Sequence, residues 1–416
     1  MDRLEQSLRD TLRDPHRSLP ADLVSLDSVH AGSARRHRRR VAAVSASAAL
    51  AALLVAVPVA LQLDGSNRGM APSDPSTSSG APSSTPSPSP DRSTGPSPSA
   101  PTAAALPWGD AHPVSVTALS ENTFFVLGRQ PACVSDCTRL ARSDDGGRTF
   151  TAMPPPGDGE DRPASAAQTV RFGSSQDGWA VGGDLWSTHD GARTWSRVDL
   201  PGHVERLEAA AGTVWAVVAR SADDEFSVWR SPVGTDDWRQ VDLPGRLQGQ
   251  VQLAVQGRRV LVLGAGTADA LFVSDGSGFD ARPSPCAPEL GGRLSASADA
   301  VWFVCANGTS ASVFVSVGSD IRFSAVPIEF LPEALPSQTL VGARSAGAAV
   351  LALPGDGGLV GISADGSRLS SYPGGTGWSY VGFTSPDVGY AITCCSIGQL
   401  LRTTDGAAHW AEVHIR

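Results

Sequence analysis

The residues best suited to chemistry stand in three short stretches that combine carboxylates, hydroxyls and small residues. They read RSDDGGRTF (142–150), STHDGARTW (187–195) and TTDGAAHW (403–410). Adjacent carboxylates can ligate calcium, and glycine-rich turns can cradle a phosphate. Calcium takes about six to eight oxygen ligands, more than a short turn supplies. The pattern therefore favours a structural turn over a metal or phosphate site, and we predict no cofactor.

Each residue type in these turns has a structural role. The glycines can adopt positive φ, which a tight hairpin turn requires. The Asp carboxylate can accept hydrogen bonds from amides of its own turn, and the preceding Ser or Thr can add its hydroxyl. The following aromatic residue can be buried between neighbouring sheets. We assign these structural turns to Ser143, Asp145, Gly147, Phe150, Thr188, Asp190, Trp195, Asp275, Asp365, Thr403, Asp405 and Trp410.

The turn recurs along the chain at a regular spacing. Weaker copies are SPVGTDDW (231–238), SDGSGF (274–279), SVGSDIRF (316–323) and SADGSRLS (363–370). The aligned anchor positions are 145, 190, 233, 275, 318, 365 and 405. Short apolar runs such as TFFVLG (123–128) and VWFVCA (301–306) precede the turns and favour strands. Four strands per unit of about 43 residues is typical of a propeller blade, so we predict an all-β, seven-bladed β-propeller over 107–416, with six or eight blades as alternatives.

The turns resemble Asp-boxes, the S-x-D-x-G-x-x-W turns of bacterial neuraminidase (BNR) repeats. The stretches 172–195 and 381–410, which contain the second and last turns, are similar to the repeats of the photosystem II assembly-factor family. The resemblance covers 107–416 and implies a sialidase-like, WD40/YVTN/BNR-like propeller. In that family the Asp-boxes lie away from the catalytic centre and carry no chemistry.

Enzymatic motifs do not accompany the repeat. The resemblance to neuraminidases would require an F/Y-R-I-P segment, three arginines on a substrate carboxylate, and a tyrosine activated by a glutamate. The F/Y-R-I-P segment is missing from the sequence, and the three tyrosines (372, 380 and 390) all lie late in the chain. The G-x-S-x-G, H-E-x-x-H and P-loop motifs are also missing. We predict a protein that is not an enzyme, with a sialidase-like glycoside hydrolase as the alternative.

The segment before the repeat predicts a membrane anchor. Residues 41–63 contain no charged residue, and a helix of that length crosses a hydrocarbon core of roughly 30 Å. The preceding RRHRRR (35–40) places residues 1–40 in the cytoplasm and the propeller outside the cell by the positive-inside rule. A cleaved signal peptide is the competing interpretation, but the apolar run is long and starts late for one. We predict a single-pass cell-membrane protein with a transmembrane helix over 41–63.

Composition predicts a stalk and excludes one class of partner. Residues 64–106 are rich in Ser, Pro and Thr and have too few apolar groups to fold, so we expect a disordered linker. The chain has a net charge of −9 although residues 1–40 are basic. An acidic exterior argues against a nucleic-acid partner, which needs a basic surface. All 33 basic residues are arginine, which favours a GC-rich, actinobacterial type of genome.

The six cysteines all follow the apolar segment. An even number in an exported domain favours disulfides, and we predict the pairs Cys133–Cys137 and Cys286–Cys305. The spacing does not fit a zinc site, which uses matched C-x₂-C pairs. The neighbouring Cys394 and Cys395 could form a strained vicinal disulfide, remain thiols or pair otherwise.

Three functions remain open at this point. The favoured one is a cell-surface propeller that binds a protein or glycan, or helps an envelope complex assemble. The second is the sialidase-like hydrolase. The third is a transmembrane regulator similar to anti-sigma factors, in which the short amphipathic stretch MDRLEQSLRDTLRD (1–14) contacts a cytoplasmic protein.

Overall fold

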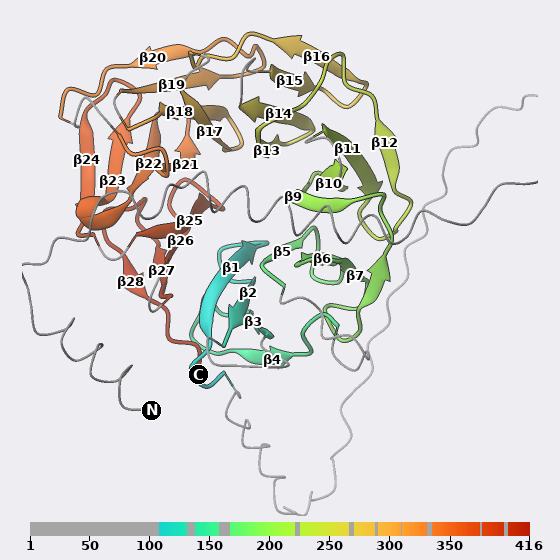
Figure 1. Ribbon diagram of the computed structural model, residues 1–416. Coiled ribbons are helices and arrows are strands. Elements are labelled where there is room, and N and C mark those ends of the chain that lie inside the picture. The colour runs from blue at the N-terminus through green and yellow to red at the C-terminus, as the bar shows by residue number, and fades with distance from the viewer. Residues whose placement is uncertain are drawn as a thin grey trace, which may run out of the picture. The chain divides into compact units, whose positions relative to one another are not determined.

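The chain forms seven four-stranded sheets around one axis (Figure 1). This confirms the predicted all-β fold and the predicted seven blades. The predicted segments 1–40, 41–63 and 64–106 lie outside the described residues. Within the described part, no helix is both long and apolar enough to span a membrane. The computed structural model describes residues 108–130, 138–157, 167–220, 225–265, 270–287, 290–308, 310–330, 335–374, 377–394 and 398–416.

Each blade is one continuous stretch of four antiparallel strands, and its first strand lies innermost (Figure 1). Blade 1 contains β1 (His112–Ala118), β2 (Phe124–Arg129), β3 (Thr138–Ser143) and β4 (Thr151–Met153), and blade 2 contains β5 (Thr169–Phe172), β6 (Gly178–Val181), β7 (Leu185–Thr188) and β8 (Ser196–Val198). Blade 3 contains β9 (His203–Ala210), β10 (Thr213–Arg220), β11 (Glu225–Pro232) and β12 (Arg239–Val241), and blade 4 contains β13 (Gln250–Gln256), β14 (Arg259–Ala265), β15 (Ala270–Ser274) and β16 (Phe279–Arg282). Blade 5 contains β17 (Gly291–Ala296), β18 (Ala300–Ala306), β19 (Ala311–Val317) and β20 (Ser324–Val326). Blade 6 contains β21 (Leu340–Ser345), β22 (Ala348–Leu353), the 3₁₀ turn η1 (Gly355–Gly357), β23 (Gly358–Ser363) and β24 (Arg368–Tyr372). Blade 7 contains β25 (Trp378–Phe383), β26 (Gly389–Thr393), β27 (Leu400–Thr403) and β28 (Ala411–Glu412).

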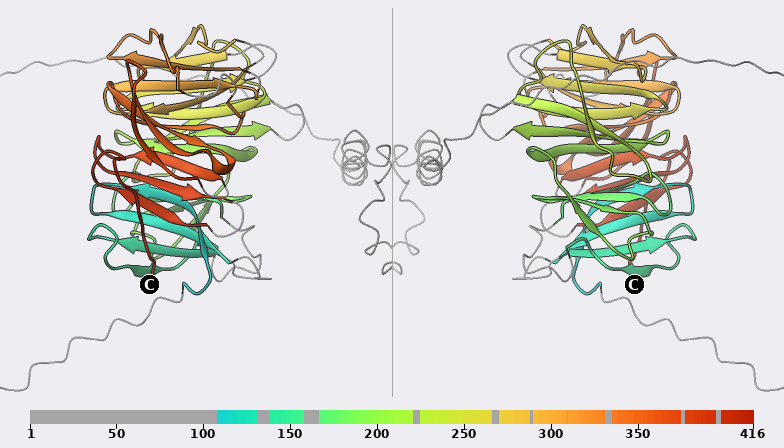
Figure 2. Two further views of the ribbon diagram at one scale, coloured as in Figure 1. Left: turned by 90° about the vertical axis from the view of Figure 1, so that its left-hand side faces the viewer. Right: turned by 90° about the vertical axis from the view of Figure 1, so that its right-hand side faces the viewer.

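The apolar core lies in the seams between blades. The second strand of a blade is buried on both faces, as along the whole of β18, and therefore reads as a continuous apolar run. The outermost strands, such as β4, are short and largely exposed. Figure 2 shows the ring from its rim, with the turns that join the strands gathered on two opposite faces.

In the described part of the chain, blade 1 contains only β1–β4 and blade 7 only β25–β28, so no strand is shared where the ring closes. Side chains and one turn make the closure instead. The Phe124 and Tyr390 rings lie 5.0 Å apart across the seam. The Arg402 Nη2 atom donates a hydrogen bond to the Glu121 carbonyl at 2.8 Å. Blades 1 and 7 are thus held by the same kinds of contact as any other pair.

Two turn glycines with the same φ differ in the space around them. Gly147 has φ 90°, and the equivalent residues of blades 2 and 7 are alanines with φ 67° and 68°, Ala192 and Ala407. A Cβ atom at Gly147 would lie 3.2 Å from the nearest side-chain atom. Gly366 also has φ 90°, but a Cβ there would lie 1.6 Å from the Pro327 carbonyl oxygen.

We therefore expect different costs for two chemically identical substitutions. Gly147→Ala should lower the free energy of unfolding by about 1 kcal/mol, the cost of a left-handed alanine. Gly366→Ala should lower it by about 3 kcal/mol or more, because the backbone at Pro327 must also move. Denaturant unfolding of both variants checks this, and equal losses would contradict the turn geometry described here.

Candidate functional site

The turn carboxylates of blades 1, 2 and 7 are saturated by their own turns. Asp145 Oδ1 accepts hydrogen bonds from the N–H groups of Arg148 and Thr149 at 3.0 and 2.9 Å, and Oδ2 accepts from the Thr149 hydroxyl at 2.6 Å. The Ser143 hydroxyl donates to Asp145 at 3.0 Å and accepts from the Gly147 N–H at 2.8 Å. Thr188 with Asp190, and Thr403 with Asp405, repeat this arrangement.

These hydrogen bonds favour the ionised carboxylate. The hydroxyl and then the amide of Thr149 lower the pKa of Asp145 to about 2. Burial opposes the shift at Asp190, but hydrogen bonds from Thr194 outweigh it and lower that pKa to about 2. The amide of His409 is the first cause of the same value, about 2, for the pKa of Asp405. The turns thus stabilise the fold above about pH 4, and this contribution is lost as the pH falls toward 2.

Blades 4 and 6 form shorter turns than the alignment of the sequence predicted. Asp275 follows Ser274 directly, one residue earlier than in the other turns, and its Oδ1 accepts from the Ser277 N–H at 3.2 Å. The alignment of Asp275 with Asp145 is therefore wrong by one residue. Asp365 accepts from the Ser363 hydroxyl and from the Ser367 N–H, the latter at 2.9 Å.

The aromatic residues of the turns lie in the seams with the preceding blades. Phe150 packs edge-to-face on Phe124 at 5.8 Å, within the apolar cluster of blades 7 and 1. Trp195 donates its indole N–H to the Pro154 carbonyl of blade 1 at 3.0 Å. Trp410 contacts the Phe383 ring at 6.1 Å beside residues of blade 6.

The predicted disulfides are described only in part. Cys286 and Cys305 are bonded, with an S–S distance of 2.05 Å. Cys133 and Cys137 lie outside the described residues. Cys394 is also disulfide-bonded and so is not a free thiol. Among the described residues, no group of three or more His, Cys, Asp or Glu could hold a metal ion.

A cavity of about 570 Å³ lies inside the ring and is lined mainly by the innermost strands of six blades, β5, β9, β13, β17, β21 and β25. Figure 1 shows these strands around the centre of the ring. We call this cavity the channel. Its charged lining residues are three arginines and two glutamates, namely Arg171, Arg206, Arg293, Glu205 and Glu208. None of them was among the site residues predicted from the sequence.

One arginine and one glutamate of the channel neutralise each other. Arg171 Nε lies 3.0 Å from Glu208 Oε1, which joins blades 2 and 3. The Arg171 side chain is 17% exposed, and its guanidinium lies over the Tyr380 ring at 6.0 Å. Burial raises the pKa of Tyr380, and Glu208 adds to this while Arg171 opposes it. The phenol therefore stays protonated at neutral pH.

The other two arginines have no carboxylate partner among the described residues. Arg206 pairs in register with Val217 of β10, and Arg293 with Val304 of β18. These are equivalent positions of blades 3 and 5, so the two arginines stand at one level of the channel. Gln252 of blade 4, which lines the channel between them, offers an amide.

With the described residues, the two guanidinium groups make only neutral hydrogen bonds. Arg206 Nη1 donates to the Glu205 carbonyl at 2.6 Å, and Arg293 Nη1 donates to Gln250 Oε1 at 3.0 Å. Burial, and then the positive charge of Arg206, lower the pKa of Arg293. Glu205 is exposed and forms no ion pair with a described residue. The channel can therefore accept an additional negative charge at these two arginines.

Comparisons with known proteins show the fold alone. No family model and no curated protein matches the chain. A structure of YCF48 bound to a D1 peptide is 17% identical with a TM-score of 0.50, covering 72% of this chain and 95% of that one. The propeller domain of the Trilobed protease from Pyrococcus furiosus is 8% identical with a TM-score of 0.51, covering 73% and 95%. Streptogramin B lyase is 16% identical with a TM-score of 0.50, covering 72% and 96%.

We expect Asp190 to contribute to stability and not to ligand binding. Asp190→Ala should lower the free energy of unfolding by about 1–2 kcal/mol, because two turn amides lose their acceptor. Asp199→Ala in the same blade, at a carboxylate 90% exposed, is the matched control and should change stability little. A loss of ligand binding at unchanged stability would instead make the turn a binding site.

Proposed function

We propose that this protein is a non-enzymatic binding propeller whose channel receives a carboxylate-bearing group of a protein or glycan. The observation that carries the proposal is the pair Arg206 and Arg293, which lack a carboxylate partner among the described residues. A guanidinium presents a planar fork of donors that matches a carboxylate, and such charged pairs are stronger than neutral hydrogen bonds.

Electrostatics supports a selective site in the channel. The whole chain is acidic, with a net charge of −9, so its long-range field does not attract anions. Two arginines at one level of the channel make the electrostatic potential positive there. Burial, and then repulsion by Arg206, lower the pKa of Arg293, and an anionic group bound between the two arginines would relieve that repulsion.

The fold is compatible with such a role. A propeller of similar fold has been solved with a D1 peptide bound, although at 17% identity this supports the proposal only through the fold. Enzymes share the fold as well, as the protease and lyase propellers illustrate. Assembly of an envelope complex would be one use of a peptide-binding channel.

The proposed location is the cell exterior, with residues 41–63 as the membrane span and 64–106 as the stalk. This arrangement rests on the sequence, since both segments lie outside the described residues. The regulator similar to anti-sigma factors rests on residues 1–14, which also lie outside them. It stays a prediction.

Binding to acidic ligands tests the proposed function. We expect the purified full-length chain to bind Asp/Glu-rich peptides or carboxylate-bearing oligosaccharides on arrays, and the two arrays distinguish a protein from a glycan partner. Arg206→Ala and Arg293→Ala should each weaken binding by about 10- to 100-fold. Arg282→Ala removes the same charge from the exposed strand β16 and is the matched control. Equal binding by all three variants would contradict the proposal.

A sialidase-like hydrolase is the second candidate, because the channel brings Tyr380 together with Glu208 and three arginines. Two features count against it. The Glu208 carboxylate is held by Arg171 at 3.0 Å, and the Tyr380 hydroxyl forms no hydrogen bond to it in the described structure. The raised pKa of Tyr380 also disfavours a nucleophilic phenolate.

A fluorogenic sialoside assay separates the two candidates. We expect no turnover by the purified protein because Tyr380 lacks a base to accept its proton. Turnover that is lost in Tyr380→Phe would establish the hydrolase and overturn the non-enzymatic proposal.

A further inference from the structure

Polar links join each blade to the next around one face of the ring. We call it the turn face, because it is formed by the turns that connect the first to the second strand and the third to the fourth strand of each blade. Six links end on backbone carbonyls: Arg142 to Ser175 at 3.4 Å, Arg230 to Gly276 at 3.2 Å, Arg259 to Gly318 at 3.0 Å, Trp302 to Ser345 at 2.8 Å, Arg344 to Pro386 at 2.8 Å and Arg402 to Glu121 at 2.8 Å.

The seam between blades 2 and 3 departs from this pattern. In blades 1, 3 and 7 the donor is the arginine directly before the Ser or Thr of the turn, namely Arg142, Arg230 and Arg402. Blade 2 has Ser187 at that position. The link from blade 2 to blade 3 is made by His189 instead of an arginine, and its acceptor is the carboxylate of Asp236 instead of a carbonyl.

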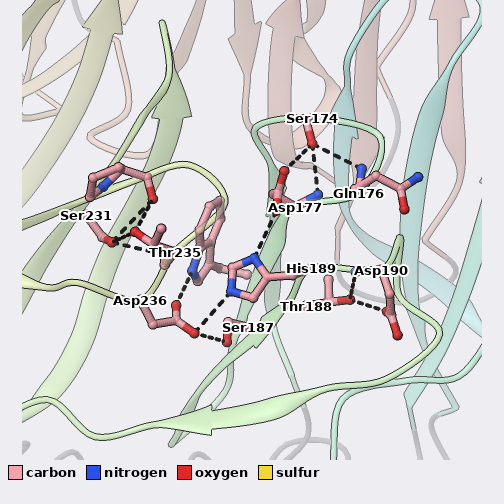
Figure 3. Close-up of polar contacts among 12 residues, drawn as sticks. Ser174, Gln176, Asp177, Ser187, Thr188, His189, Asp190, Ser231, Thr235 and Asp236 are labelled. Atoms are coloured by element: carbon pink, nitrogen blue, oxygen red, sulfur yellow. Dashed lines mark hydrogen bonds and ion pairs between the residues drawn. The ribbon is translucent and has the colours of Figure 1, made fainter.

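His189 lies between two carboxylates from different blades (Figure 3). Its Nδ1 is 2.9 Å from Asp177 Oδ1 in the β5–β6 turn, and its Nε2 is 3.2 Å from Asp236 Oδ2 in the β11–β12 turn. The Ser174 hydroxyl holds Asp177 at 2.6 Å, and the Ser187 hydroxyl holds Asp236 at 2.6 Å. Both carboxylates are therefore fixed in place on either side of the His189 imidazole.

Only the doubly protonated imidazolium satisfies this geometry. Ionised carboxylates are acceptors, so each ring nitrogen must carry a proton to form its hydrogen bond. A neutral His189 would direct one lone pair at a carboxylate and lose either the bond within blade 2 or the bond to blade 3. The arginine links of the other seams carry a permanent charge and do not share this dependence.

The other charged groups around the bridge already have partners in the described structure. They are Asp190, held by Thr188 and Thr194; Arg193, which donates to the Asp190 carbonyl; Asp237, paired with Arg239; and Arg142, paired with Asp144. The Trp179 indole N–H adds a neutral bond to Asp236 at 3.3 Å. Proton uptake at His189 is thus governed by Asp177 and Asp236.

We propose that the Asp177–His189–Asp236 bridge is a proton-dependent latch that tightens the seam between blades 2 and 3 when His189 is charged. Partial burial opposes the charge, but the hydrogen bonds that His189 donates to Asp177 and Asp236 outweigh it and raise the pKa of His189 above its usual value. A raised pKa in the folded state means stabilisation that is fully present below about pH 6.5 and is lost as the pH rises through the folded-state pKa.

The latch regulates the proposed binding site through the same seam. Blades 2 and 3 also meet at the Arg171–Glu208 pair of the channel, and blade 3 supplies Arg206. A looser seam at high pH would move these groups relative to one another. The latch itself does not depend on the proposed function, because it is read out through stability.

Thermal unfolding of the full-length chain at pH 5.5 and 8.0 tests the latch. The quantity compared is Tm at pH 5.5 minus Tm at pH 8.0, for the unaltered protein, His189→Gln and Asp236→Asn. Both substitutions should shrink that difference by about 2 °C. Glutamine at position 189 cannot gain a proton, and an uncharged asparagine at position 236 no longer favours the second proton on His189. His203→Gln, at an exposed histidine of β9 outside the bridge, should leave it unchanged.

A double-mutant cycle between positions 189 and 236 keeps the test decisive if one variant is less stable overall. The two substitutions should be more strongly coupled at pH 5.5 than at pH 8.0, because only the imidazolium forms both bonds at once. An unchanged pH difference in Tm for His189→Gln, or the same coupling at both pH values, would overturn the proposal. Either result would leave the arginine site in the channel unaffected.

Discussion

Each blade of this propeller has two apolar faces, and both must be covered by neighbouring blades. Among the described residues, no strand is shared between blades 1 and 7, so contacts in the seam hold the ring closed there. Apolar contacts such as Phe124 against Tyr390 fill the seams, and the polar links of the turn face fix the blades in register. The channel exists only because all seven seams form, which makes its arginine pair a product of the whole ring.

The fold could be predicted because its signals are local and repeated. The turn residues Asp145, Asp190 and Asp405 act within a few positions of one another, so their spacing survives in the sequence. The continuous apolar second strands carry an equally local signal, since burial on both faces leaves no place for polar residues. Where the turn shortens, as at Asp275, the sequence alignment was wrong by one residue because Asp275 directly follows Ser274, the last residue of β15.

The candidate site could not be predicted in the same way. Arg206 and Arg293 are far apart in the sequence and stand at one level of the channel only because their strands occupy equivalent places in two blades. Charged residues within the innermost strand of a repeat, as in HVERLEAA, were the available signal. The His189 bridge could not be predicted for a related reason, since Asp177 and Asp236 come from turns of different blades.

We propose that Arg206 and Arg293 are available to an anionic ligand, whereas Arg171 is not. Arginine labelling with phenylglyoxal, followed by peptide mass spectrometry, measures this directly. We predict rapid labelling of Arg206 and Arg293, protection of both by an acidic ligand, and slow labelling of the buried, paired Arg171. Labelling of Arg206 and Arg293 as slow as that of Arg171, or unaffected by every acidic ligand that binds, would contradict it.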